Sequence, residues 1–250
     1  MSIPFPASIN KDSLFIWLIH SISETFHDRA ILKGGMALRL IESPRNTNDL
    51  DYIFVPYESK KDILVDLENI VSDIPDSEID ISLHSKSVRI NIYHKKTSIQ
   101  LEANVGKECK SLPISTSSYA KRVNETGRII NIMDLNVALS HKLCAWNERR
   151  LVRDLYDIYF LYKMVNAFPE KNIIIQRLNN IQSRIPRLKK KKKMGLYDFF
   201  NELLKEIKQI NFEKIKTELS PLLKKEDLVG LDIKIKAALN ELLDKMETSF

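Results

Sequence analysis

Residues 34–54 read GGMALRLIESPRNTNDLDYIF, and this stretch decides the fold of the 250-residue chain. Gly34 and Gly35 open a run that predicts a helix over residues 35–41, which ends before Pro44. A Gly-Gly turn at the start of a helix exposes backbone N–H groups and is suited to holding phosphate. The stretch therefore indicates a phosphate-binding turn at its beginning.

An Asp-Leu-Asp follows the glycines after thirteen residues, and its flanks alternate between apolar and polar. The alternation predicts a strand over residues 51–55 that Pro56 closes. Side chains two apart on a strand point to the same face, so Asp49 and Asp51 lie side by side. Two carboxylates this close repel each other by roughly 1 kcal/mol, and hard divalent cations such as Mg2+ prefer such oxygen ligands. Together with the glycine turn, they predict a metal-dependent site for a nucleoside triphosphate.

Composition is typical of a soluble globular protein, with 44% hydrophobic and 29% charged residues. No apolar run approaches the ~20 residues of a membrane span, and the first residues lack the pattern of a secretory signal. Cys109 and Cys144 lie 35 residues apart without a CxxC spacing, which argues against a zinc site or a disulfide framework. We therefore expect a cytoplasmic protein with no membrane partner.

Positive charge is concentrated in residues 171–197, which contain nine Lys or Arg and no Asp or Glu. Such a block can attract a polyanion by counterion release, and we expect it to guide RNA. The alternative is a solvated basic loop. The candidate RNA-binding residues are Arg184, Arg187, Lys189, Lys190, Lys191, Lys192 and Lys193.

The period of the apolar residues divides the chain into two halves. Helices are predicted over residues 10–26 and 60–74, and alternating strands over residues 78–83, 87–93 and 98–105. Short polar links join these strands, so we expect them to extend the sheet as antiparallel neighbours. After residue 132 the pattern predicts helices over residues 135–146, 152–165, 170–182, 196–210, 212–223 and 231–246. We expect an α/β half of about 130 residues and then a helical half.

A third carboxylate near Asp49 and Asp51 would complete the ligand set that two-metal phosphoryl transfer needs. Glu102 is the candidate, because it lies on the same strand face as Gln100. The apolar residues that alternate with them along the strand lie on the opposite face. The alternatives are that Glu102 only faces solvent, or that Asp80 takes the role in a weaker sequence context.

Two blocks of this chain resemble a known family. KGGMALRL at residues 33–40, with RNTNDLD at residues 45–51, resembles the nucleotidyltransferase superfamily typified by DNA polymerase β. The full string of both segments is similar to the AbiEii/AbiGii toxin family, whose members are nucleotidyltransferase toxins that include the MenT group. LSHKLCAW at residues 139–146 and RDLYDIY at residues 153–159 are similar to that family's helical K-x-x-A and R-D-x-Y-D motifs.

The resemblance implies an α+β fold: a minimal nucleotidyltransferase α/β domain, with a mixed sheet flanked by helices, and then a helical C-terminal domain. We place these domains at residues 1–130 and 131–250, with the site in the cleft between them. The family implies Mg2+, with two ions expected, and a nucleoside triphosphate as substrate. It also implies transfer of nucleotides to RNA, at the 3′ end of tRNA, which blocks translation, and a cognate antitoxin as partner.

Carried onto this chain, the family motifs assign roles to particular residues. Lys33, Gly34, Gly35 and Thr47 would border the triphosphate, and Asp49 and Asp51 would hold metal. Lys142 would neutralise phosphate charge in the transition state, and Asp157, with Asp154 as near neighbour, would complete the site from the helical side. Met36 departs from the small hydroxyl residue that often follows the glycines, so one hydroxyl contact to phosphate is absent.

Other interpretations of these residues are open from the sequence alone. Without the motif, Lys142 would be an ordinary surface lysine, and Asp157 could pair with Arg153 along a helix for roughly 0.2–0.5 kcal/mol. The same chemistry could act on a protein hydroxyl or a small molecule. A non-catalytic member of the family could bind only nucleotide or a partner.

Overall fold

The computed structural model describes residues 3–6, 9–85, 87–183, 185–186 and 192–250. They form two compact units, one that ends at Asp134 and one that begins at Leu135. Among the described residues, no helix is both long enough and apolar enough to cross a membrane.

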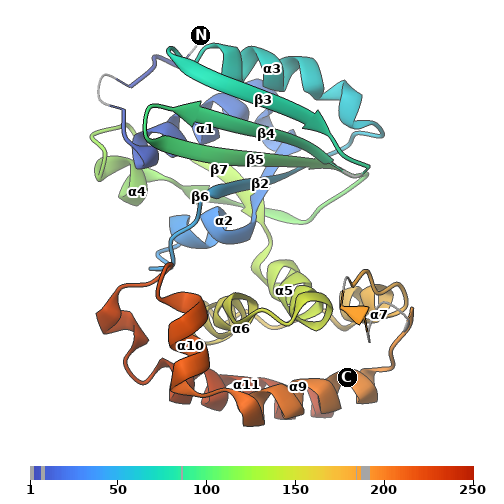
Figure 1. The fold of residues 1–250 in the computed structure, drawn as a ribbon. Helices are drawn as coiled ribbons and strands as arrows, with labels where there is room; N and C mark the ends of the chain where they lie inside the picture. The colour runs from blue at the N-terminus through green and yellow to red at the C-terminus, as the bar shows by residue number, and fades with distance from the viewer. Residues whose placement is uncertain (1–2, 7–8, 86, 184, 187–191) are drawn as a thin grey trace. The chain divides into compact units, whose positions relative to one another are not determined.

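The first unit is built on a seven-stranded sheet with the strand order β3-β4-β5-β2-β1-β7-β6 (Figure 1). Strand β2 pairs antiparallel with β1 and parallel with β5, and β1 pairs parallel with β7. The sheet is therefore mixed, as the family resemblance implied. The strands are β1 (Ala30–Lys33), β2 (Asp49–Phe54), β3 (Ser77–Leu83), β4 (Ser87–His94), β5 (Thr97–Val105), β6 (Ser111–Ser115) and β7 (Ile129–Met133).

The three alternating strands expected over residues 78–83, 87–93 and 98–105 are confirmed as β3, β4 and β5, which pair in antiparallel register. Three other strands were not predicted from the sequence: β1, β6 and β7. Strand β1 has only four residues, too few to show a period. Strand β7 reads IINIM, an apolar run in which alternation is broken.

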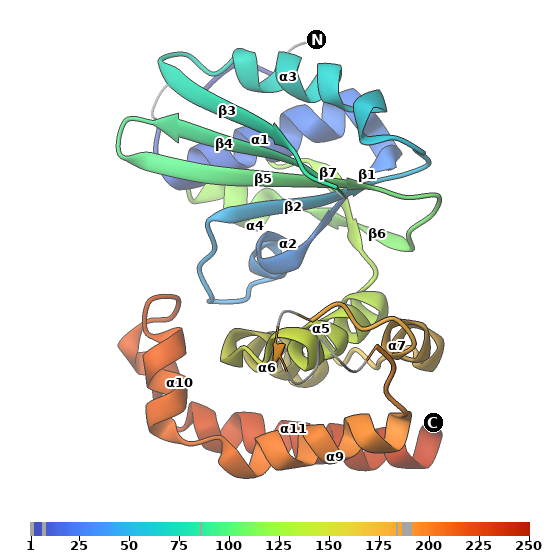
Figure 2. The ribbon, with the colours of Figure 1, turned by 45° about the vertical axis from the view of Figure 1, so that its right-hand side comes forward.

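Helices cover the sheet of the first unit, and α1 and α3 lie against the same face in both views (Figures 1 and 2). Helix α1 begins with a capping box between Asn10 and Ser13, and its last residue, Phe26, packs edge-to-face on Phe54 of β2, with ring centroids 4.6 Å apart. The elements are α1 (Lys11–Phe26), a short 3-10 turn η1 (His27–Arg29), α2 (Gly34–Leu40), the 3-10 turn η2 (Lys60–Asp62), α3 (Leu64–Ser72) and α4 (Ser117–Lys121).

Strand β2 has one buried face and one partly exposed face. Leu50, Tyr52 and Phe54 are at most 2% exposed and form part of the core, whereas Asp49 and Asp51 alternate with them and are partly exposed. Phe54 points toward α1, so the aspartates point to the opposite face of the sheet. The core under α1 and α3 thereby fixes the register that places both carboxylates together.

The second unit is helical in its described part, as predicted. The helix expected over residues 152–165 is α6 followed by a π-helical turn, and α7 and α10 are each a few residues shorter than expected. Helices α9 and α11 lie side by side in both views (Figures 1 and 2). The elements are α5 (Leu135–Arg149), α6 (Val152–Tyr159), the π turn η3 (Phe160–Met164), α7 (Lys171–Leu178), α9 (Leu196–Gln209), α10 (Phe212–Leu219), the 3-10 turn η4 (Lys225–Leu228) and α11 (Leu231–Ser249).

A buried histidine in the first unit, His20, has a hydroxyl group as its partner. His20 of α1 is 3% exposed, and its Nε2 lies 2.8 Å from Oγ1 of Thr116. That hydroxyl also accepts a hydrogen bond from the Arg128 backbone N–H, at 2.9 Å. Burial, and secondarily the nearby Arg128 guanidinium, lower the pKa of His20 to about 4.

We expect His20 to make the protein less stable in mild acid. The unfolded chain protonates this side chain near pH 6.5 and the folded chain only near pH 4, so acidification through this window favours unfolding by at most about 1.4 kcal/mol per pH unit. Urea unfolding at about pH 7 and about pH 5 measures the loss. His20→Gln should lose less stability between the two, whereas the exposed-site control His84→Gln should behave like wild type. Equal losses in His20→Gln and wild type would refute the assignment.

Candidate active site

Two neighbouring strands bring the predicted carboxylates onto one face of the sheet. Strands β2 and β5 run parallel, with Asp51 opposite Glu102 and Asp49 opposite Gln100. The competing candidate, Asp80, lies on the edge strand β3, is exposed and accepts a hydrogen bond from a side-chain amide on β4 at 3.1 Å. Glu102, not Asp80, is therefore the third carboxylate next to the Asp-Leu-Asp strand.

The pairing registers extend this arrangement into a row of charges across four strands. Arg89 of β4 lies opposite Glu102, Glu102 opposite Asp51, and Asp51 opposite Lys33 of β1. Two carboxylates are thus flanked by two cations. Glu102 forms an ion pair with Arg89, whose Nη2 lies 3.3 Å from Oε2 of the carboxylate.

The oxygen-only donor set of Asp49, Asp51 and Glu102 suits a hard divalent cation such as Mg2+ better than zinc, which favours Cys and His ligands. Within the described residues, however, no three acidic, His or Cys side chains already converge as a metal-binding group. The backbone register places these carboxylates on adjacent strands, so metal binding would require their side chains to rotate toward one another.

The glycine turn approaches the carboxylates too closely for any side chain. Gly34 has a φ of +74°, and a Cβ there would lie 2.3 Å from Oδ2 of Asp51. A Cβ on Gly35 would lie 2.5 Å from Nη2 of Arg45 and 3.1 Å from Oγ1 of Thr47. Gly34 therefore suits the left-handed backbone of this turn, and a Cβ at Gly34 or Gly35 would force the Asp51 carboxylate or the Arg45 guanidinium group to move.

We expect Gly34→Ala to impair the site more than it impairs the fold. The control is Gly230→Ala, because Gly230 also has a positive φ, of +67°, but has open space where a Cβ would lie. Both variants incur the left-handed backbone penalty, of the order of 1–2 kcal/mol, and only Gly34→Ala displaces the Asp51 carboxylate. Thermal melting and transfer assays on both variants test this. Equal activity of the two variants would contradict the proposed contact.

Thr47, Arg45 and Lys11 surround the beginning of β2. Thr47 is 7% exposed, and its Oγ1 accepts a hydrogen bond from the Asp49 backbone N–H at 3.2 Å, which fixes the start of the strand. Lys11 donates a hydrogen bond to the Asn48 side chain. Burial and then Arg39 lower the pKa of Lys11, against the opposing effect of nearby carboxylates that include Asp49. The sequence pattern assigned no role to Lys11 or Arg45.

The sequence motif could have indicated Arg45, but no local pattern could have indicated Lys11. Arg45 stands in the same R-x-T-x-D string as Thr47 and is 7% exposed, so its place in the motif could have identified it. Lys11 lies 37 residues from its partner Asn48, and no local pattern connects them.

The helical unit holds a second cluster of predicted residues, on α5 and α6. Lys142 Nζ lies 2.6 Å from Oδ2 of Asp157 and 3.9 Å from Oδ1 of Asp154. Arg149, which the sequence pattern did not indicate, binds Asp154 through Nη2 at 2.6 Å and Nε at 3.2 Å. Both aspartate side chains are 1% exposed, so two buried negative charges are balanced by two cations.

The sequence positions this cluster through the core of the unit. Leu139 and Trp146 of α5 are fully buried and hold the helix face that carries Lys142. Tyr156 and Phe160 are also buried in the core, whereas Tyr159 is partly exposed. The side chain of Lys142 is 17% exposed, so part of it reaches solvent while its ammonium group is bonded to Asp157.

The predicted RNA-binding segment is described only in part. Lys192 and Lys193 are exposed and lie just before α9, whose first turn carries Tyr197, 79% exposed. The other candidates lie outside the described residues: Arg184, Arg187, Lys189, Lys190 and Lys191.

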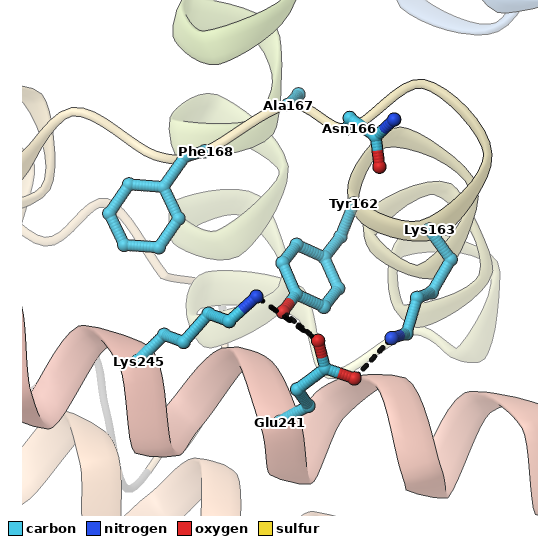
Figure 3. Close-up of a pocket in the computed structure, with 7 residues that line it drawn as sticks. All are labelled: Tyr162, Lys163, Asn166, Ala167, Phe168, Glu241 and Lys245. Carbon is cyan, nitrogen blue, oxygen red and sulfur yellow. Dashed lines mark hydrogen bonds and ion pairs between the residues drawn. The ribbon is translucent and has the colours of Figure 1, made fainter.

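A pocket in the helical unit, with a cavity volume of about 230 Å3, lies elsewhere (Figure 3). Its lining includes Tyr162, Lys163, Glu241 and Lys245, and none of the sequence-predicted site residues. The Glu241 carboxylate accepts hydrogen bonds from Lys163, from Tyr162 at 2.7 Å and from Lys245 at 3.1 Å. These bonds lower the pKa of Glu241 to about 2. The three donors in this pocket are therefore bonded to a single carboxylate of the same unit.

Comparison with known proteins gives one family match and several structural similarities. The family model described as nucleotidyl transferase AbiEii toxin, type IV TA system, matches residues 18–244. The crystal structure of JHP933 from Helicobacter pylori is similar over 97% of this chain and 96% of its own, at 17% identity and a TM-score of 0.54. The CdnE cyclic dinucleotide synthase of Elizabethkingia meningoseptica aligns over 93% of each chain at 14% identity, with a TM-score of 0.29. No match among curated protein sequences was found.

Proposed function

This chain belongs to the AbiEii family of nucleotidyltransferase toxins, and we propose that it transfers nucleotides from a nucleoside triphosphate to RNA and so inhibits translation. The proposed acceptor is the 3′ end of tRNA. The observation that supports the chemistry best is the row of Asp51 and Glu102 in register, with Asp49 on the same face and the Gly34 turn against Asp51.

Asp49, Asp51 and Glu102 would hold Mg2+, with two ions expected. When bound, Mg2+ supplies positive charge that offsets the charge of the triphosphate. Gly34, Gly35, Thr47 and Lys33 border the triphosphate in the proposal. Glu102 or Asp51 accepts the proton of the acceptor hydroxyl, whose oxygen attacks the α-phosphate in line as pyrophosphate leaves.

For Lys142 we propose the role that the family motif gives it, the neutralisation of phosphate charge in the transition state. Its ammonium group has three N–H donors, and its 2.6 Å bond to Asp157 uses one of them. Asp157 and Asp154 would then keep the ammonium in place while its remaining donors face phosphate.

The acceptor is proposed from charge. Exposed Lys192 and Lys193 belong to the segment with nine basic and no acidic residues, and such a field favours a polyanion over a cationic small molecule. Transfer to a protein hydroxyl is the main alternative. A purely binding role fits less well, because the mutual repulsion of Asp49 and Asp51 would then serve no purpose. We further propose a cytoplasmic location and a cognate antitoxin as partner.

The test is incubation of the purified protein with total tRNA, Mg2+ and each α-labelled nucleoside triphosphate in turn, beside an Asp49→Ala control. Label in RNA from one or two nucleotides, absent in the control, is expected, and it identifies the donor. Label in protein would favour the alternative acceptor. No label in either, with Mg2+ binding also absent, would contradict enzymatic transfer by this chain.

The basic segment gives a separate prediction. Replacing Lys189 to Lys193 with Gln should weaken tRNA binding, and the slope of log K against log salt should become shallower by about 0.7–0.9 for every phosphate that is no longer neutralised. The matched control neutralises five exposed lysines of the same unit: Lys205, Lys208, Lys224, Lys225 and Lys234. If both sets change affinity and slope equally, the segment acts only through net charge.

A further inference from the structure

The structure pairs the third carboxylate of the site with a cation of its own chain. Arg89 and Glu102 lie opposite each other on β4 and β5, and Nη2 is 3.3 Å from Oε2. Glu102 in turn lies opposite Asp51 on β2. One carboxylate is therefore placed between a guanidinium group and the other carboxylates of the site.

We propose that Arg89 is the internal counter-ion of Glu102 and competes with the divalent metal for that carboxylate. This inference rests on the proposed function, in which Glu102 is a metal ligand. Both cations need the carboxylate oxygens of Glu102, and a positive charge beside them raises the free energy of bringing a dication to the same group.

The contact is suited to exchange. The two side chains are 37% and 28% exposed, and a partly exposed ion pair is weak. Arg89 also uses its donors incompletely, because its Nε is buried and has no hydrogen-bond partner among the described residues. A guanidinium group that bound both carboxylate oxygens as a fork would be harder to displace. Arg89 is thus a positioning residue: it holds Glu102 until the metal takes it.

The test is titration of nucleotide-free protein with Mn2+, with free Mn2+ counted by electron paramagnetic resonance. Arg89→Gln should bind Mn2+ about three- to tenfold more tightly than wild type, because the competing charge is removed. Arg128→Gln is the matched control, since Arg128 forms an ion pair with Glu24 at 2.8 Å in the same unit, and it should not change the affinity. In a Glu102→Gln background the effect of Arg89→Gln should vanish.

Unchanged or weaker Mn2+ binding by folded Arg89→Gln would overturn the competition. A second comparison holds even if that variant does not fold. With Arg89 present, Glu102→Gln should weaken nucleotide-free Mn2+ binding less than about threefold, and Asp51→Asn at least about tenfold; equal losses would overturn the inference. If Asp51→Asn has no effect on Mn2+ binding, the metal site of the proposed function itself fails.

Discussion

Replacing Asp51 with Asn is expected to reduce nucleotidyl transfer by at least about a thousandfold. The substitution keeps the shape of the side chain and removes the charge that the proposed metal and the acceptor hydroxyl both require. Asp51 lies in register with Glu102 and directly under the glycine turn, so no other described carboxylate occupies its place. Steady-state kinetics with labelled nucleoside triphosphate measure the loss.

The fold should tolerate this change. Asp51 lies on the partly exposed face of β2, and its removal relieves the repulsion with Asp49, so Tm should stay the same or rise slightly. Asp80→Asn is the control, because Asp80 is an exposed carboxylate on the edge strand of the same sheet. If Asp80→Asn loses as much activity as Asp51→Asn, the charge of the whole face is responsible and not the position of Asp51.

Replacing Lys142 with Met is expected to abolish activity and also to destabilise the helical unit by about 3–5 kcal/mol. The reason is that Asp157, whose side chain is 1% exposed, would lose the cation 2.6 Å away and leave a buried charge without it. Urea unfolding followed by circular dichroism measures the effect. Lys205→Met is the control, because Lys205 forms only an exposed pair and should change stability by about 1 kcal/mol or less.

A double variant separates the structural role of Lys142 from its proposed catalytic role. Lys142→Met combined with Asp157→Asn removes both charges, so much of the lost stability should return, whereas transfer activity should not. Recovery of activity with stability would show that Lys142 is needed only to hold the fold.

The face of β2 could be predicted from the sequence because a period of two is a local signal. Alternation placed Asp49 and Asp51 on one face, and it also placed Glu102 opposite the apolar residues of its strand. The pairing of Glu102 with Asp51 was only a hypothesis, since which strands become neighbours depends on the whole topology.

Features that depend on distant residues could not be predicted. Strand β1 is four residues long and is held between β2 and β7, so its conformation comes from its neighbours and not from its own pattern. The bond from Arg149 to Asp154 crosses the break between two helices, and the hydrogen bond from Lys11 to Asn48 spans 37 residues. These interactions place further charged groups beside the predicted residues, and the partners come together only when the chain folds.

The most direct test of the central claim compares α-labelled with γ-labelled nucleoside triphosphate in the presence of Mg2+ and tRNA. Nucleotidyl transfer predicts that wild-type protein moves α-label into RNA, releases γ-label as pyrophosphate, and does neither with EDTA or with Asp51→Asn. Transfer of γ-label to the acceptor, or α-label transfer that Asp51→Asn leaves intact, would contradict the role assigned to the carboxylate face of β2 and β5.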